Sequence, residues 1–192
     1  MADTTAAEAF YAAAFDVGSW LRVRASNAPT TGFRGFTMSL VVSQPASANH
    51  LIDSAVESGA TVLKPAARSL WGYGGIVRAS DGTIWTVASS SKKDTGPPTR
   101  QIDAIVLQLG VTDVAASKQF YVDHGLSVAK SYGNRYVEFD TCAIKLTLNK
   151  RGVLAKTAGV SSEGTGSHRL LIGGDAGAFT DPDGFVWEAA TH

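Results

Sequence analysis

Only a few residues of this chain have the types and spacing that chemistry requires. The 192 residues include four histidines and one cysteine, Cys142. A single thiol forms neither an intrachain disulfide nor a multi-cysteine zinc site. Cys142 lies in an alternating apolar stretch, so we predict a buried structural thiol rather than a nucleophile. No glycine-rich phosphate loop follows a strand, and no Ser, His and Asp set has a hydrolase's spacing.

The four histidines differ in the positions that the sequence gives them. His50 lies near a predicted helix start, where we expect it to be solvated, and His192 is terminal. His124 lies at a predicted helix end, where an imidazole can cap the last carbonyl groups. His168 begins a predicted strand, His168–Ile172, and is either a hydrogen-bonded structural residue or a metal ligand.

Composition excludes several classes of function. The 17 Lys and Arg residues balance the 17 Asp and Glu residues, whereas a nucleic-acid-binding protein usually carries excess positive charge. No apolar run is long enough to cross a bilayer. The alanine-rich N-terminus lacks the basic residues of a signal peptide. We therefore expect a cytoplasmic protein with neither a nucleic-acid nor a membrane partner.

Apolar periodicity and turn residues predict alternating helices and strands that must position these side chains. The predicted helices are Thr5–Asp16, His50–Ser58, Asp113–His124 and one turn at Val153–Lys156. The predicted strands are Trp20–Arg24, Phe36–Val42, Thr61–Lys64, Gly74–Arg78, Ile84–Val87, Ile102–Leu109, Leu126–Ala129, Arg135–Phe139, Ala143–Leu148, His168–Ile172 and Phe185–Ala189. The order strand, helix, strand, strand, strand thus occurs twice, at 36–90 and 102–148.

Two short motifs repeat along the chain. Phe10-Tyr11 matches Phe120-Tyr121, and Ser80–Trp85 matches Pro182–Trp187. The offsets are 121 − 11 = 110 and 187 − 85 = 102, so the halves are unequal in length. We predict a first half at 1–90, a linker rich in Ser, Lys, Gly and Pro at 91–101, and a second half at 102–192 with a shortened closing hairpin.

Five segments, taken in their order along the chain, resemble the corresponding segments of one known superfamily. They are Leu70–Gly75, Ser80–Trp85, Val111–Asp113, Lys118–Tyr121 with Gly125-Leu126, and Phe179–Glu188. Together they resemble the vicinal oxygen chelate superfamily, which includes glyoxalase I, bleomycin-resistance proteins and extradiol dioxygenases. The resemblance implies an α+β fold of tandem βαβββ modules. These would form a curled mixed sheet, a cup or half-barrel around a ligand site, with helices on the outer faces.

The resemblance also implies where a metal would bind. Metal-dependent members hold one divalent ion through His or Gln on the first strand of each module and Glu on the last. Here the corresponding positions carry Thr37, Ala104 and Thr86, which are poor ligands or none. Only His168 and Glu188 match. We therefore expect no cofactor; the alternative is a single Zn, Ni, Mn or Fe ion in a glyoxalase-type lyase, isomerase or transferase that uses His168 and Glu188.

Other residues are expected to contact a ligand in the cup. Trp71 and Tyr73 lie in the glycine-rich hairpin arm, where rings can stack on a planar molecule, although Trp71 could instead fill the core. Thr86 faces the cup by strand parity, as does one of Tyr136 and Val137. Arg78 is one of several strand cations that could fix an anionic or oxygen-rich group.

The resemblance and these residues together imply a glyoxalase- or bleomycin-resistance-like protein that binds a small, partly aromatic or oxygen-rich molecule in the cup between modules without a metal. Whether the protein is an enzyme stays open, because Glu188 in an apolar cup could serve as an acid or base. A structural or regulatory protein with a filled cup is a third possibility. Either a monomer or a homodimer is compatible with the two modules.

Overall fold

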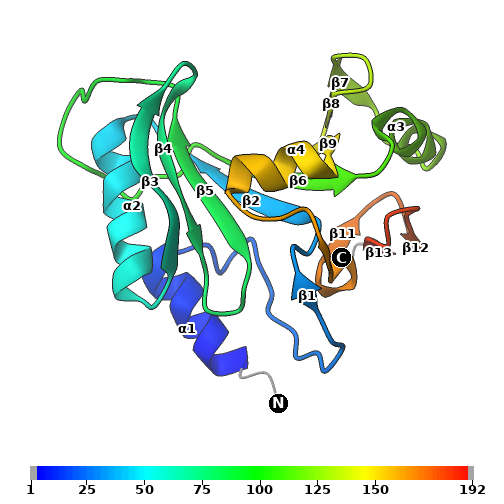
Figure 1. The fold of residues 1–192 in the computed structure, drawn as a ribbon, viewed down its shortest axis with the longest axis horizontal. Helices are drawn as coiled ribbons and strands as arrows, with labels where there is room; N and C mark the ends of the chain where they lie inside the picture. Colours follow the sequence, from blue (N-terminus) through cyan, green and yellow to red (C-terminus); the bar gives the residue numbers. More distant parts are fainter. Residues whose placement is uncertain (1–3, 190–192) are drawn as a thin grey trace. The chain divides into compact units, whose positions relative to one another are not determined.

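The computed structural model describes residues 4–189 of the chain (Figure 1). The first elements are α1 (Thr4–Ala14), β1 (Thr31–Gly32), β2 (Phe36–Val41), α2 (Pro45–Glu57), β3 (Thr61–Ser69), β4 (Gly72–Arg78) and β5 (Ile84–Ser89). The following elements are β6 (Ala104–Val111), α3 (Val114–Asp123), β7 (Val128–Ser131), β8 (Tyr136–Phe139), β9 (Lys145–Lys150) and α4 (Arg151–Ala158). The chain then continues through β10 (Gly164–Thr165), a 3-10 turn (Ser167–Arg169), β11 (Leu171–Gly174), β12 (Phe179–Thr180) and β13 (Val186–Ala189).

The chain forms two compact units. Unit 1 contains the described residues up to Asn27 together with Thr37–Val106, and unit 2 contains Ala28–Phe36 together with the described residues from Leu107 on. Each unit has the predicted βαβββ order, β2-α2-β3-β4-β5 in the first and β6-α3-β7-β8-β9 in the second. The mixed α+β architecture expected from the sequence is confirmed.

In unit 1 the strands lie in the order β3-β4-β5-β2, and helices cover one face of the sheet. β2 runs parallel to β5, while β3, β4 and β5 are antiparallel neighbours. The Trp85 ring on β5 is fully buried, with its centroid 5.0 Å from that of Phe15 and 5.7 Å from that of Tyr11 of α1. A side chain on Gly75 of β4 would collide with Ile52 of α2, so both helices lie on the face that Trp85 occupies.

In unit 2 the strands repeat this arrangement in the order β7-β8-β9-β6, and a three-stranded sheet β11-β13-β12 follows. Asp113 caps α3 by accepting hydrogen bonds from the amides of Ala115 and Ala116. The rings of Tyr121 on α3 and Phe139 on β8 have centroids 5.5 Å apart, so α3 packs on the face that Phe139 occupies. Trp187 on β13 is 5% exposed and also packs on Tyr121, as strand parity predicts.

The two repeated sequence motifs meet within each unit. In unit 1 the Tyr11 hydroxyl donates to Asp81 Oδ2 at 2.9 Å, and in unit 2 the Tyr121 hydroxyl donates to Asp181 Oδ2 at 2.7 Å. Burial raises the pKa of both tyrosine hydroxyls, and each neighbouring carboxylate raises it further. Each pair ties a helix to the turn before a buried tryptophan strand, which gives the repeat a structural role.

The segment 91–101, which the sequence suggests as a linker, is fixed to unit 1. The Gln44 side chain before α2 is 3% exposed and is satisfied entirely by this segment. Its Oε1 accepts hydrogen bonds from the amides of Thr95 (2.7 Å) and Gly96 (3.1 Å). Its Nε2 donates to the carbonyls of Gly96 (3.1 Å) and Pro97 (2.8 Å). The segment therefore forms a strap across the start of α2.

Several local predictions are wrong. Trp20–Arg24 forms a turn and irregular chain rather than a strand, and Trp20 is 49% exposed, so its alternation has no buried face to pack against. Cys142 is exposed rather than buried, because it lies in the turn before β9, which begins only at Lys145. Two helices are longer than predicted: α2 starts at Pro45, which suits a first helical turn, and α4 runs over eight residues.

Candidate functional site

The two residues proposed as metal ligands lie on different kinds of structure. His168 is exposed and occupies the 3-10 turn Ser167–Arg169, not the start of a strand as predicted. The strand β11 begins only at Leu171. Glu188 lies on β13, half-buried and opposite Gly173 in the register with β11. His168 therefore lacks the strand register that would align it with Glu188.

The donor set does not fit a divalent ion held by three protein ligands. Thr37 and Thr86 offer only neutral hydroxyls at the positions that the resemblance gives to ligands, and Ala104 offers no donor atom. Across residues 4–189, no three side chains of His, Cys, Asp or Glu gather closely enough to hold a metal ion. We therefore derive no chemistry through a metal in this chain.

The face of the unit 1 sheet opposite α1 and α2 brings two predicted residues together. Thr86 on β5 is paired with Ser39 of β2 and with Ile76 of β4, and paired residues share a face. Arg78 follows two residues after Ile76 on β4 and is exposed, so it lies on that same face. We call this surface, with Ser39, Ile76, Arg78 and Thr86, the Thr86 face.

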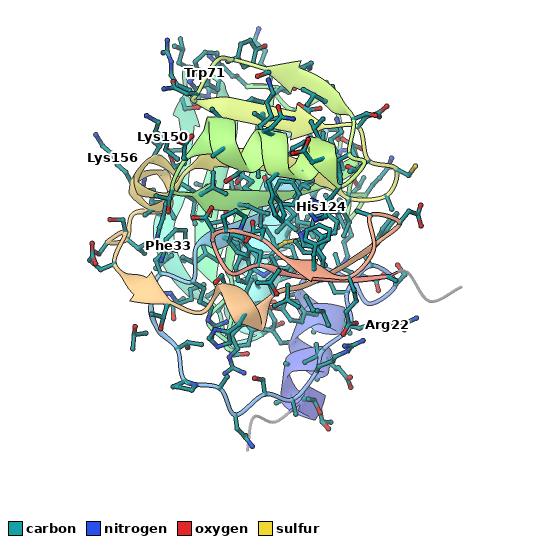
Figure 2. The ribbon with its side chains drawn as sticks, turned by 90° about the vertical axis from the view of Figure 1, so that its right-hand side faces the viewer. Arg22, Phe33, Trp71, His124, Lys150 and Lys156 are labelled. Carbon is teal, nitrogen blue, oxygen red and sulfur yellow. The ribbon has the colours of Figure 1, made fainter. Side chains whose placement is uncertain are left out.

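Tyr73 and Trp71 lie elsewhere. Tyr73 alternates with Gly74 on β4 and lies on the helix side, where its hydroxyl donates to Asn49 Oδ1 of α2 at 2.8 Å. It is therefore not on the face where we expected it. Trp71 lies in the turn between β3 and β4 and is 85% exposed, so the alternative that it fills the core is wrong. Figure 2 labels this side chain.

The face of the unit 2 sheet opposite α3 carries a polar cluster around Tyr136. Val137 is fully buried, so Tyr136 is the member of the pair on the other face. The Tyr136 hydroxyl donates to Glu138 Oε2 at 3.0 Å. Tyr136 is paired with Asn149 of β9, and Glu138 with Thr147. We call this surface, with Tyr136, Glu138, Thr147 and Asn149, the Tyr136 face.

The electrostatics of this cluster keep Tyr136 protonated. Burial, followed by the hydrogen bond to Glu138 and the charge of that carboxylate, raises the pKa of Tyr136 from the ordinary 10.0 to about 12. The phenol is thus a neutral donor at any physiological pH. Glu138 contributes acceptor oxygens on the same surface.

This pair gives a testable titration. Replacing Glu138 with glutamine removes the carboxylate charge, so the pKa of Tyr136 is expected to fall toward 10.0 while burial keeps it above that value. NMR of ring-labelled tyrosine measures this directly. Because the folded-state pKa is raised, the Tyr136 contribution to stability is present below pH 10 and is lost as pH rises through about 12. An unchanged Tyr136 pKa in the Glu138→Gln variant would contradict the contact.

Sequence reasoning missed Glu138, Thr147 and Asn149. The period-two alternation of β8 already places Glu138 beside Tyr136 on one face, so the pattern held that signal. The register of β9 against β8 was needed to find Thr147 and Asn149, and strand pairing between segments cannot be obtained from periodicity within one segment.

A shallow hollow with a volume of about 590 Å³ also lies in unit 2, where β6 ends and α4 begins. Its lining includes Thr112, Lys150, Arg151, Ser162 and Glu163. The three hydrogen bonds found for the Arg151 guanidinium all go to backbone carbonyls. The lining also mixes both signs of charge, so we assign no ligand to this hollow.

Comparison with known proteins bears on the fold. No protein-family model and no curated protein matches the chain. Among solved structures, a candidate dioxygenase from Bacillus subtilis matches over 84% of this chain and 64% of its own, with a TM-score of 0.51 and 11% identity. The chain has the vicinal oxygen chelate fold.

Two further solved structures match with lower TM-scores. A glyoxalase I mutant from Zea mays matches over 83% of this chain and 67% of its own, with a TM-score of 0.48 and 15% identity. A glyoxalase-related enzyme from Fulvimarina pelagi matches over 46% of this chain and 81% of its own, with a TM-score of 0.34 and 22% identity. Neither of these two matches supports a conclusion about the fold or the activity of this chain.

The helices of the described part are short. The longest of them, α2, has 13 residues, and none of those within residues 4–189 is both long and apolar enough to cross a bilayer.

Proposed function

We propose that this chain binds a small, partly aromatic or oxygen-rich molecule without a metal ion, using the Thr86 face or the Tyr136 face. The observation that carries the proposal is the chemistry of these two surfaces. Their polar groups are hydroxyls, an amide, one phenol, one carboxylate and one guanidinium, rather than a cluster of imidazoles and carboxylates. Such groups suit hydrogen bonding to an organic molecule better than coordination of an ion.

The Tyr136 face offers both kinds of contact that such a molecule needs. The half-buried ring of Tyr136 provides planar apolar surface for stacking, at a low cost in side-chain entropy. Its phenol hydrogen bonds to Glu138, and Asn149 in the facing position adds an amide donor and acceptor. On the Thr86 face, Arg78 can pair with a carboxylate or another oxygen-rich group.

The alternative, a metal-dependent lyase, isomerase or transferase that uses His168 and Glu188, has less support. His168 is exposed in a 3-10 turn, and two protein ligands rarely hold a hard cation against water. We propose no catalytic role for Glu188, whose neighbours give no reason to assign one. The single exposed thiol of Cys142 is in keeping with a reducing compartment such as the cytoplasm.

A ligand screen observed on the protein itself tests this function. Isotope-labelled protein in a chelator-containing buffer is titrated with aromatic and oxygen-rich small molecules, and amide shifts are followed by NMR. We expect at least one saturable ligand whose shifts cluster on β8 and β9, or on β2, β4 and β5. Absence of any saturable ligand, or shifts confined to the helix sides of both sheets, would contradict the proposal.

A pair of tyrosine variants makes the test specific. Tyr136→Phe removes the phenol of the Tyr136 face and is expected to weaken a ligand bound there about fivefold to tenfold, the effect of one lost hydrogen bond. Tyr73→Phe removes an equivalent phenol on the helix side, where its partner is Asn49, and should leave the affinity unchanged. Equal losses in both variants would indicate a general destabilisation rather than a binding face.

A further inference from the structure

The turn between β3 and β4 presents two large apolar side chains to solvent. Leu70 is 80% exposed and Trp71 is 85% exposed, the highest values among the large apolar side chains of residues 4–189. The turn is held in place, because Ser69 Oγ accepts a hydrogen bond from the Trp71 amide at 3.2 Å. The end of the β3–β4 hairpin (Figure 1) therefore carries two exposed apolar side chains, and we call it the Leu70–Trp71 tip.

Positive charge surrounds this tip within unit 1. The Lys92 ammonium donates to the Leu70 carbonyl at 3.0 Å, which places one cation at the turn itself. Lys93 follows it, and Arg68 lies two residues before Leu70; both are exposed. The neighbouring acid, Asp94, is engaged elsewhere, since its Oδ1 accepts a hydrogen bond from the Ala46 amide of α2 at 2.6 Å. One cation is thus held at the turn, and two more exposed cations lie within two residues of the turn or of Lys92 in the sequence.

We propose that the Leu70–Trp71 tip docks unit 1 onto an anionic lipid surface. Indole rings favour the interface between water and lipid, and an aliphatic neighbour gains from burial at the acyl boundary. Lysine and arginine beside it are attracted to the phosphates of acidic headgroups. The sequence expectation of no membrane partner rested on the lack of a spanning segment, which a surface contact does not require. This inference is independent of the ligand-binding function.

The exposed Leu70 side chain favours an anionic lipid surface over single-stranded nucleic acid, the other polyanion that this tip could bind. Single-stranded nucleic acid would stack on Trp71 and pair with the same cations. Leu70 gains nothing from base stacking, whereas it gains from contact with lipid chains. The high exposure of both side chains therefore favours a lipid surface.

Vesicle sedimentation tests the proposal with the full chain. Protein is mixed with vesicles of phosphatidylcholine alone or of equal parts phosphatidylcholine and phosphatidylglycerol, and the bound fraction is measured at low and high salt. We expect binding only to the acidic vesicles, weakened by salt as counterions screen the three cations. Trp71→Ser and Leu70→Ser are each expected to lower the partition coefficient by roughly threefold to tenfold.

Matched variants decide among the outcomes. Trp20→Ser removes a half-exposed tryptophan elsewhere in unit 1 and should leave binding unchanged. Lys92→Gln with Lys93→Gln should weaken the preference for acidic vesicles, and adding Arg68→Gln should abolish it. No binding to acidic vesicles would overturn the proposal. So would an equal loss in Trp20→Ser, or binding to a single-stranded oligonucleotide that depends on Trp71 but not on Leu70. Circular dichroism confirms that each variant is folded, as expected for exposed positions.

Discussion

Replacing Asp181 with alanine is expected to lower the free energy of unfolding by about 4 kcal/mol. The Asp181 side chain is 4% exposed and accepts three hydrogen bonds within unit 2. Its Oδ2 accepts from the Tyr121 hydroxyl at 2.7 Å, and its Oδ1 accepts from the amides of Asp183 at 3.0 Å and Phe185 at 2.8 Å. Alanine would leave three buried donors without partners. Urea denaturation followed by circular dichroism measures the loss.

The corresponding residue of unit 1 is the control. Asp81 accepts from the Tyr11 hydroxyl and the Thr83 amide in the same way, but it is exposed, so water can replace it. Asp81→Ala is therefore expected to cost about 1–2 kcal/mol. If Asp181→Ala fails to fold, Tyr121→Phe removes one bond and should cost about 1–2 kcal/mol. Equal effects at Asp181 and Asp81 would show that burial does not set the strength of this contact.

Replacing Arg151 with methionine is expected to lower the free energy of unfolding by about 2–3 kcal/mol. Arg151 Nε donates to the Ser162 carbonyl at 2.9 Å, and its Nη2 donates to the carbonyls of Phe33 at 2.5 Å and Gly164 at 2.9 Å. The guanidinium also lies 5.2 Å from the centre of the Phe33 ring. Methionine keeps much of the side-chain length but leaves three carbonyls without this donor.

The neighbouring cation provides the matched comparison. Lys150 is exposed, and its side chain makes no capping hydrogen bond to α4 (labelled in Figure 2). Lys150→Met is therefore expected to change the free energy of unfolding by less than about 0.5 kcal/mol. Arg151→Lys should fall between the two, because one ammonium cannot reach all three carbonyls. A neutral Arg151→Met variant in the same urea titration would show that these bonds do not hold the segment around Phe33 in place.

Much of the fold could be predicted from sequence, because local patterns agreed with one another. Alternation in β4, β5 and β8, the cap at Asp113 and the repeated tyrosine and tryptophan motifs all pointed to βαβββ modules. Strand parity predicts that Trp85 and Trp187 pack against helices, and their ring contacts with Tyr11 of α1 and Tyr121 of α3 confirm this. Parity also placed Thr86 on the opposite face.

The candidate site was harder to predict from the sequence, because it depends on contacts between distant segments. Trp20–Arg24 alternates without any partner strand to pair with, and periodicity alone cannot reveal that. Tyr73 lies on the helix side because it alternates with Gly74 along β4, and the position of the hairpin arm alone does not indicate that face. The hydrogen bonds of Gln44 to the 91–101 segment and the pairing of Asn149 with Tyr136 join residues that are distant in the sequence. Such contacts cannot be obtained from the local pattern of a single sequence.

Ligand affinity with and without divalent ions tests the central claim most directly. A ligand found by the NMR screen is titrated into protein treated with a strong chelator, and into protein supplied with Zn²⁺, Ni²⁺, Mn²⁺ or Fe²⁺. Because the two faces carry hydrogen-bonding groups rather than a set of three metal ligands, the dissociation constant should be the same in all samples. Binding that is lost on chelation and restored by one of these ions would contradict the account.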